Sequence, residues 1–83
     1  MKVRYTEDGY HDLANLPQEL RDRIANKVEF YASQNDPTRF AKRLSGYDAY
    51  RFRVGNYRVI FEVSGDVLFV LAIVKRDDAY KGL

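Results

Sequence analysis

The unbroken apolar run from Val67 to Val74 places the tightest limit on how this chain can fold. Such a run is typical of a strand that is covered on both faces and therefore lies inside a sheet. The turn residues Gly65 and Asp66 stand directly before it, and residues 58–64 have the composition of a strand that can pair with it. The sequence thus predicts an antiparallel hairpin whose second strand is central.

Another hairpin precedes this one along the chain, with Gly55 and Asn56 as its turn. In a two-residue turn Arg53 faces Arg58 across the two strands, and alternation puts Arg51 on the same face. Like charges that lie opposite each other destabilise a sheet, so these three arginines favour a role in binding an anion. The other face of the hairpin carries its apolar side chains: Phe52, Val54, Tyr57, Val59 and Phe61.

The face with the three arginines, the arginine face, is expected to be open and to have an apolar floor. Alternation through a two-residue turn at residues 65–66 adds four apolar side chains to it: Ile60, Phe69, Leu71 and Ile73. Because the chain offers only two substantial helices, they can cover only one face of the sheet. An exposed apolar patch of this size is typical of a binding site. We therefore expect a groove with an arginine rim.

The N-terminal part predicts a short strand at residues 2–6 and a first helix that ends at about Ala14. Thr6 or Asp8 can cap this helix. Its apolar face is expected to consist of Tyr10, Leu13 and Ala14.

Pro17 suits the first turn of a second helix, and Asn35-Asp36-Pro37 ends it. Its apolar stripe repeats at helical spacing: Leu20, Ile24, Val28 and Tyr31. Residues 38–44 predict one or two further helical turns, with Phe40 and Leu44 facing inward.

Together these elements predict an α+β fold in a single domain over residues 1–83. The expected sheet is small and antiparallel, with an N-terminal strand, two helices on one face and a C-terminal three-stranded meander. A chain of 83 residues has room for one modest core.

Composition excludes several kinds of site. The chain has no cysteine and one histidine, so it cannot form a disulfide, and we expect no metal and no cofactor. No apolar run reaches the roughly 18 residues that a membrane span needs, and residues 1–4 do not begin a signal peptide. These features favour the cytoplasm. Basic residues gather between Arg39 and Arg58, where Asp48 is the single acid, and this suits a compact site for a polyanion.

Four segments, in this order and spacing, resemble the RelE/ParE superfamily of toxins from toxin–antitoxin systems. They are Leu16-Pro17 before the long helix, KRLSG at residues 42–46, YRFRVGNYRVIF at residues 50–61 and KRDDAY at residues 75–80. The resemblance covers nearly the whole chain. It implies the RelE-like fold, in agreement with the elements predicted above.

The resemblance also implies a function. RelE-like toxins cleave mRNA in the ribosomal A site without a metal, by attack of the ribose 2′-hydroxyl on the neighbouring phosphate. It therefore implies an mRNA endoribonuclease that inhibits translation, with the ribosome and mRNA as partners. A cognate antitoxin is expected to bind this chain and keep it inactive. Contact with DNA is expected only indirectly, through the complex with the antitoxin.

Particular residues receive roles from the same resemblance. The catalytic positions would be Arg58 and Arg76, which hold the scissile phosphate, and Tyr80, which stacks on a base or relays a proton. The RNA-binding positions would be Arg51, Arg53, Lys42 and Arg43. Because arginine does not readily release its proton, Tyr80 is the better candidate for the general base.

Several alternatives stay open at this stage. Unbroken alternation puts Arg76 on the helix-covered face, and it joins the other arginines only if the strand ends or bulges near Lys75. The arginines can also form a solvated face that pairs with acids such as Glu62. A ParE-like inhibitor of DNA gyrase without RNase activity, or a catalytically inactive homologue that binds an antitoxin, would share the same fold.

Overall fold

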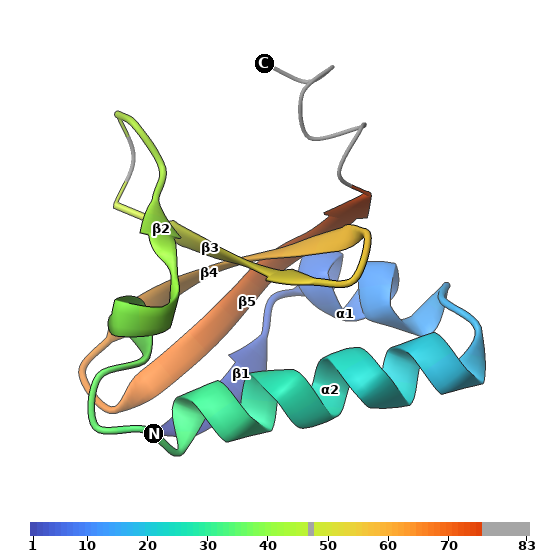
Figure 1. Cartoon of the computed structure of the whole chain (residues 1–83), viewed down its shortest axis with the longest axis horizontal. Coiled ribbons are helices and arrows are strands. Elements are labelled where there is room, and N and C mark those ends of the chain that lie inside the picture. Colours follow the sequence, from blue (N-terminus) through green and yellow to red (C-terminus); the bar gives the residue numbers. More distant parts are fainter. Residues whose placement is uncertain (47, 76–83) are drawn as a thin grey trace.

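The computed structural model describes residues 1–46 and 48–75 of the chain. Its elements are β1 (Lys2–Tyr5), α1 (Glu7–Ala14), α2 (Gln18–Ala32), the 3-10 turn η1 (Pro37–Phe40), β2 (Lys42–Arg43), β3 (Tyr50–Val54), β4 (Tyr57–Ser64) and β5 (Val67–Lys75). Figure 1 shows both α-helices on one side of the sheet, and no described helix on its other side. The α+β class is confirmed.

The strands form one sheet in the order β1-β5-β4-β3-β2, so β5 is an inner strand, as its apolar run predicts. Strands β2 to β5 pair antiparallel, which confirms the meander. Strand β1 instead runs parallel to β5, with Lys2 opposite Val67, so the sheet is mixed and not wholly antiparallel. The parallel direction is possible because a long connection, which includes α1 and α2, separates the two strands.

The hairpin at Gly55 and Asn56 has the predicted register, with Arg53 opposite Arg58. Gly55 adopts a φ of +59°, a conformation that glycine enters without the penalty that a Cβ atom imposes. The conformation of Gly55 and the alternation of side chains on the two strands are therefore both consistent with Arg53 opposite Arg58.

The pairing of β4 with β5 contains a β-bulge. Ile60 lies opposite Ala72, whereas the next residue, Phe61, lies opposite Val70, so Leu71 is an extra residue in β5. Because side chains alternate between faces, one extra residue reverses the assignment of every later position in the strand.

The bulge corrects the predicted floor of the arginine face. Ile73 belongs to the core, with 6% of its surface exposed. Ala72 and Val74 lie on the arginine face instead, opposite Ile60 and Arg58. The prediction that Ile73 lies on that face is wrong, since it assumed unbroken alternation.

Helix α1 lies against the bulged part of β5. The Thr6 hydroxyl caps α1 by accepting a hydrogen bond from the backbone N–H of Gly9, as predicted. The same hydroxyl lies 3.2 Å from the carbonyl oxygen of Val70 and 3.3 Å from that of Leu71, to which it donates. Asp12 accepts a hydrogen bond from the backbone N–H of Ile73. These side chains satisfy backbone groups of β5 beyond the point where β1 ends.

The core lies between the sheet and the two helices. Ile24 and Val28 of the predicted stripe are fully buried, and Leu20 and Tyr31 pack against the core from its border. On α1 the expectation is partly wrong, since Leu13 is buried but Tyr10 and Ala14 are exposed. The short helix presents only a narrow side to β5, and Gly9 lies so near the backbone of Val70 that a Cβ atom there would collide with its carbonyl oxygen. None of the helices in the described ranges is long and apolar enough to cross a membrane.

Residues 38–44 differ from the predicted helical turns. The turn η1 ends at Phe40, and Lys42 and Arg43 form the edge strand β2, which pairs with Arg51 and Tyr50 of β3. Phe40 does not face inward, since 49% of its surface is exposed. The available hydrogen-bonding edge of β3 explains why this segment extends instead of continuing as a helix.

Candidate functional site

A hollow of about 470 Å³ lies at the edge of the sheet where η1, β2 and β3 meet. Its lining, which we call the cationic hollow, consists of Arg39, Phe40, Ala41, Lys42, Arg51, Phe52, Arg53 and Arg58. Strand β2 pairs only with Tyr50 and Arg51, so the edge of β3 beyond Arg51 has no other described strand beside it. The hollow forms beside the first residue of the short strand β2, where the chain passes from η1 into that strand.

Two cross-strand rows bring the cations of the hollow together. In one row Lys42 lies opposite Arg51, and in the next Arg53 lies opposite Arg58. Residues that lie directly opposite each other have Cβ atoms about 4.5–5.5 Å apart. The register therefore confirms that the three hairpin arginines share a face, and it adds Lys42 to them.

Arg58 is the buried member of this cluster. Only 6% of its surface is exposed, whereas Arg53 is exposed and Arg51 is half-buried. The apolar Val74 lies opposite Arg58 on the strand that flanks it on the side away from Arg53. A guanidinium stays charged inside a protein, and a charge next to apolar groups acts more strongly on an anion than the same charge in water. Arg58 is thus held in place as a fixed positive charge.

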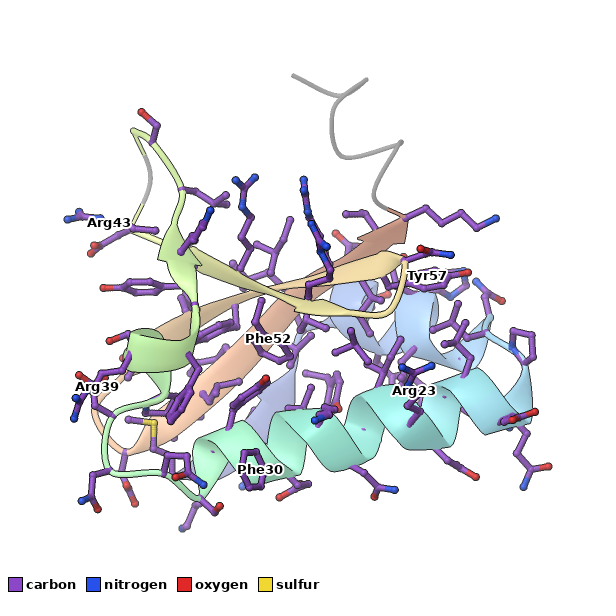
Figure 2. The ribbon with its side chains drawn as sticks, viewed as in Figure 1. Arg23, Phe30, Arg39, Arg43, Phe52 and Tyr57 are labelled. Carbon is purple, nitrogen blue, oxygen red and sulfur yellow. The ribbon has the colours of Figure 1, made fainter. Side chains whose placement is uncertain are left out.

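The outer wall of the hollow carries Phe40. Its ring stacks on that of Tyr31, with centroids 5.4 Å apart and 29° between the ring planes. Tyr31 packs edge-on against Phe52, with centroids 4.5 Å apart. Figure 2 shows Phe52 on the side of the sheet that faces α2, while Arg39 projects from η1, of which it is part. Aromatic contacts thus join α2, η1 and β3 at the hollow.

Sequence reasoning alone does not identify Arg39 and Phe40 as site residues. The basic stretch that begins at Arg39 was the available signal. The prediction of helical turns with inward-facing side chains over residues 38–44 leaves no hollow beside β3. The outer wall of the hollow exists only when Lys42 pairs with β3.

The charge of the hollow determines what it can bind. Five cationic side chains line it, and no acidic side chain does so within the described ranges. Guanidinium groups suit phosphate oxygens in charge and geometry, so the site fits a polyanion such as a nucleic-acid backbone. The described lining can stabilise negative charge on a phosphate, but it offers no side chain that readily accepts a proton.

Comparison with known proteins agrees with the predicted resemblance. A family model described as the ParE toxin of the type II toxin–antitoxin system parDE matches residues 3–80. This chain belongs to the RelE/ParE toxin family. A relative of this RelE/ParE toxin, named Toxin RelE3, comes from Methanocaldococcus jannaschii and is 36% identical over 84 residues, or 96% of each chain.

Solved structures show the same fold for this toxin. The RelB–RelE antitoxin–toxin complex from Methanococcus jannaschii contains a chain that matches with a TM-score of 0.76 and 30% identity, covering 98% of the toxin and 99% of that chain. The archaeal RelE–RelB complex from Pyrococcus horikoshii OT3 matches with a TM-score of 0.70 and 26% identity, covering 90% and 93%. The predicted RelE-like fold is confirmed.

The remaining candidate residues of the toxin are placed differently. Arg43 does not line the hollow, and its guanidinium forms an exposed ion pair with Asp48 at 3.2 Å. Arg76 and Tyr80 lie outside the described residues.

Proposed function

We propose that this toxin is a ribosome-dependent endoribonuclease that cleaves mRNA and thereby inhibits translation. The observation that carries the proposal is the cationic hollow, where the buried Arg58 lies opposite the exposed Arg53. When a ribose 2′-hydroxyl attacks the neighbouring phosphate, negative charge builds up on a pentavalent phosphorus. Fixed cations around that phosphate stabilise the transition state more than the ground state.

We assign phosphate binding to Arg58 together with Arg76, and guidance of the RNA backbone to Arg51, Arg53 and Lys42. We assign no RNA contact to Arg43, since its guanidinium pairs with Asp48 and lies outside the cationic hollow.

Proton transfer needs a group that the described lining does not supply. The reaction requires a base for the 2′-hydroxyl and an acid for the leaving 5′-oxygen. We assign this work to Tyr80, whose phenol can exchange a proton, whereas the arginines of the hollow hold theirs.

A cognate antitoxin is part of the proposal. The two solved structures described above are complexes of RelE with RelB. We propose that an antitoxin with acidic and apolar side chains covers the cationic hollow of this toxin and keeps it inactive, since opposite charges would meet there. DNA would be bound by the antitoxin part of such a complex.

Mapping mRNA 5′ ends by primer extension after induction tests the proposal. Breaks inside codons of translated mRNA are expected for the wild type and should be fewer for Arg53→Ala. Arg43→Ala is the matched control, because Arg43 is also exposed but lies outside the hollow. Intact transcripts in growth-arrested cells would exclude the ribonuclease function.

Inhibition of DNA gyrase is the second candidate, and the match to the ParE family model favours it. Stalled gyrase–DNA complexes alongside intact mRNA would support this function. Absence of both effects, with antitoxin binding retained, would indicate an inactive homologue.

A further inference from the structure

We propose that Phe40 is a stacking platform for an RNA base, which makes it a substrate-positioning residue of the cationic hollow. The inference rests on the proposed ribonuclease function for the choice of RNA as ligand. It deepens that function by assigning base contact to an aromatic side chain on η1, a segment to which neither the resemblance nor the arginine hairpin points.

Phe40 is exposed although it is a large apolar side chain, with 49% of its surface accessible. Single exposed apolar residues are common and need no explanation. Phe40 differs because its exposed ring lies within the lining of a hollow that also carries five cations. An aromatic surface next to several positive charges is the arrangement by which proteins bind single-stranded nucleic acid, with bases on the rings and phosphates on the cations.

The ring of Phe40 is also held in place. Tyr31 backs it at 5.4 Å in a stacked arrangement, and Tyr31 is itself packed against the buried Phe52. A ring fixed in this way loses little conformational freedom when a base stacks on it. The exposed Phe30 touches the same Tyr31, with centroids 5.5 Å apart, but it lies outside the cationic hollow.

The spacing of charge and ring favours RNA over a folded protein partner. Arg39 and Lys42 flank Phe40 along the chain, and Arg51 lies opposite Lys42 on the neighbouring strand. Cations on either side of an aromatic ring suit the alternation of phosphate and base along a single strand. An antitoxin segment that used this ring would be a competing occupant, and the experiment distinguishes the two.

Binding of two uncleavable probes tests the inference without relying on catalysis. The probes are a 2′-O-methyl hexauridylate and an abasic 2′-O-methyl ribose-phosphate chain of the same length. Phe40→Ala is expected to weaken binding of the base-bearing probe on the order of tenfold, because one stacked base is lost. Binding of the abasic probe should stay unchanged. Phe40→Tyr should retain affinity, and Phe30→Ala is the matched control that should bind both probes like the wild type.

A spectroscopic signal adds an independent readout. The chain has no tryptophan, so Phe40→Trp and Phe30→Trp each introduce a single tryptophan, whose fluorescence can be excited apart from that of the tyrosines. Quenching by the base-bearing probe is expected for Phe40→Trp and not for Phe30→Trp. Circular dichroism of each variant would establish that it is folded.

Four results would overturn the inference. Equal weakening of both probes by Phe40→Ala would mean that the ring only shapes the wall. Wild-type affinity in Phe40→Ala, or no binding of the base-bearing probe by the wild type, would mean that no base stacks there. Weakened binding of the antitoxin without any effect on RNA would assign the ring to the competing occupant. The mRNA mapping described above is a separate measurement, so failure of the ribonuclease function and failure of base stacking can be told apart.

Discussion

The carboxylate of Asp12 accepts a hydrogen bond from the backbone N–H of Ile73 at 3.0 Å, and so joins α1 to the far part of β5. Strand β1 pairs with β5 only as far as Val70. Beyond that point α1 lies against β5 in place of a strand, and Asp12 supplies one of its hydrogen bonds to β5. The bulge that brings Val74 beside Arg58 therefore depends on a helix on the opposite side of the sheet.

Replacement of Asp12 by alanine should destabilise the fold by about 1–2 kcal/mol, because the N–H of Ile73 would lose its acceptor in a partly buried place. Asp12→Asn keeps a carbonyl oxygen and should cost less. Urea unfolding followed by circular dichroism measures the change, and amide exchange by NMR reports on the Ile73 N–H directly. Asp22→Ala, on the exposed side of α2, is the control and should change stability by less than about 0.5 kcal/mol. Continued protection of the Ile73 amide in Asp12→Ala would contradict the proposed contact.

Gly9→Ala should also destabilise the protein, although alanine is favoured over glycine in an unobstructed helix by about 1 kcal/mol. A Cβ atom at residue 9 would lie 2.3 Å from the carbonyl oxygen of Val70, so α1 would have to move away from β5. Overpacking of this kind costs about 1–3 kcal/mol. The midpoint of thermal unfolding should therefore fall, whereas His11→Ala on the exposed side of the same helix should leave it nearly unchanged. A higher midpoint for Gly9→Ala would show that α1 does not pack this closely.

Tyr5 should make stability depend on pH under alkaline conditions. Burial raises the pKa of its phenol above the ordinary 10.0, and the nearby Glu29 carboxylate raises it further. Below pH 10 the phenol is neutral in the folded and unfolded states. Above pH 10 the unfolded chain loses this proton first, so the free energy of unfolding falls until the folded-state pKa is passed.

The variant Tyr5→Phe lacks this proton, and its stability should fall less steeply above pH 10. Denaturant titrations between about pH 8 and pH 11, the range around the ordinary tyrosine pKa, measure the slope. Tyr10→Phe is the matched control, because 63% of Tyr10 is exposed. Equal slopes for the wild type and Tyr5→Phe would argue against the raised pKa.

The charge of Arg53 should appear in the salt dependence of RNA binding. Removal of one phosphate contact lowers the slope of log affinity against log salt by about 0.7 for a single strand. Fluorescence anisotropy of a labelled single-stranded RNA across several salt concentrations should therefore give a shallower slope and weaker binding for Arg53→Ala. Arg43→Ala should keep the wild-type slope, since Arg43 pairs with Asp48 outside the hollow. A loss of slope in Arg43→Ala alone would move the RNA path away from the hollow.

The hairpin of β3 and β4 could be predicted from sequence because its information is local. Gly55 and Asn56 determine the turn, and alternation on each side then places Arg53 opposite Arg58. The stripe on α2 was predictable for the same reason, since its period is visible within one segment.

The bulge could not be predicted, because its partners are far away in the sequence. Thr6 and Asp12 satisfy β5 backbone groups more than 60 positions later, 64 for Thr6 with Val70 and 61 for Asp12 with Ile73. Strand β2 was missed for a similar reason, since two residues become a strand only beside β3. The roles of Arg76 and Tyr80 stay predictions.

The parallel pairing of Lys2 with Val67 has a consequence for the timing of folding. Among the described strands β1 leaves the ribosome before the others, and its one partner in the sheet is β5. Contacts of such wide sequence separation form slowly, because a long loop must close before any of them contributes. A nascent chain that stops before β5 lacks both the partner of β1 and the strand that flanks Arg58, so the toxic fold is expected to form only after β5 has been synthesised.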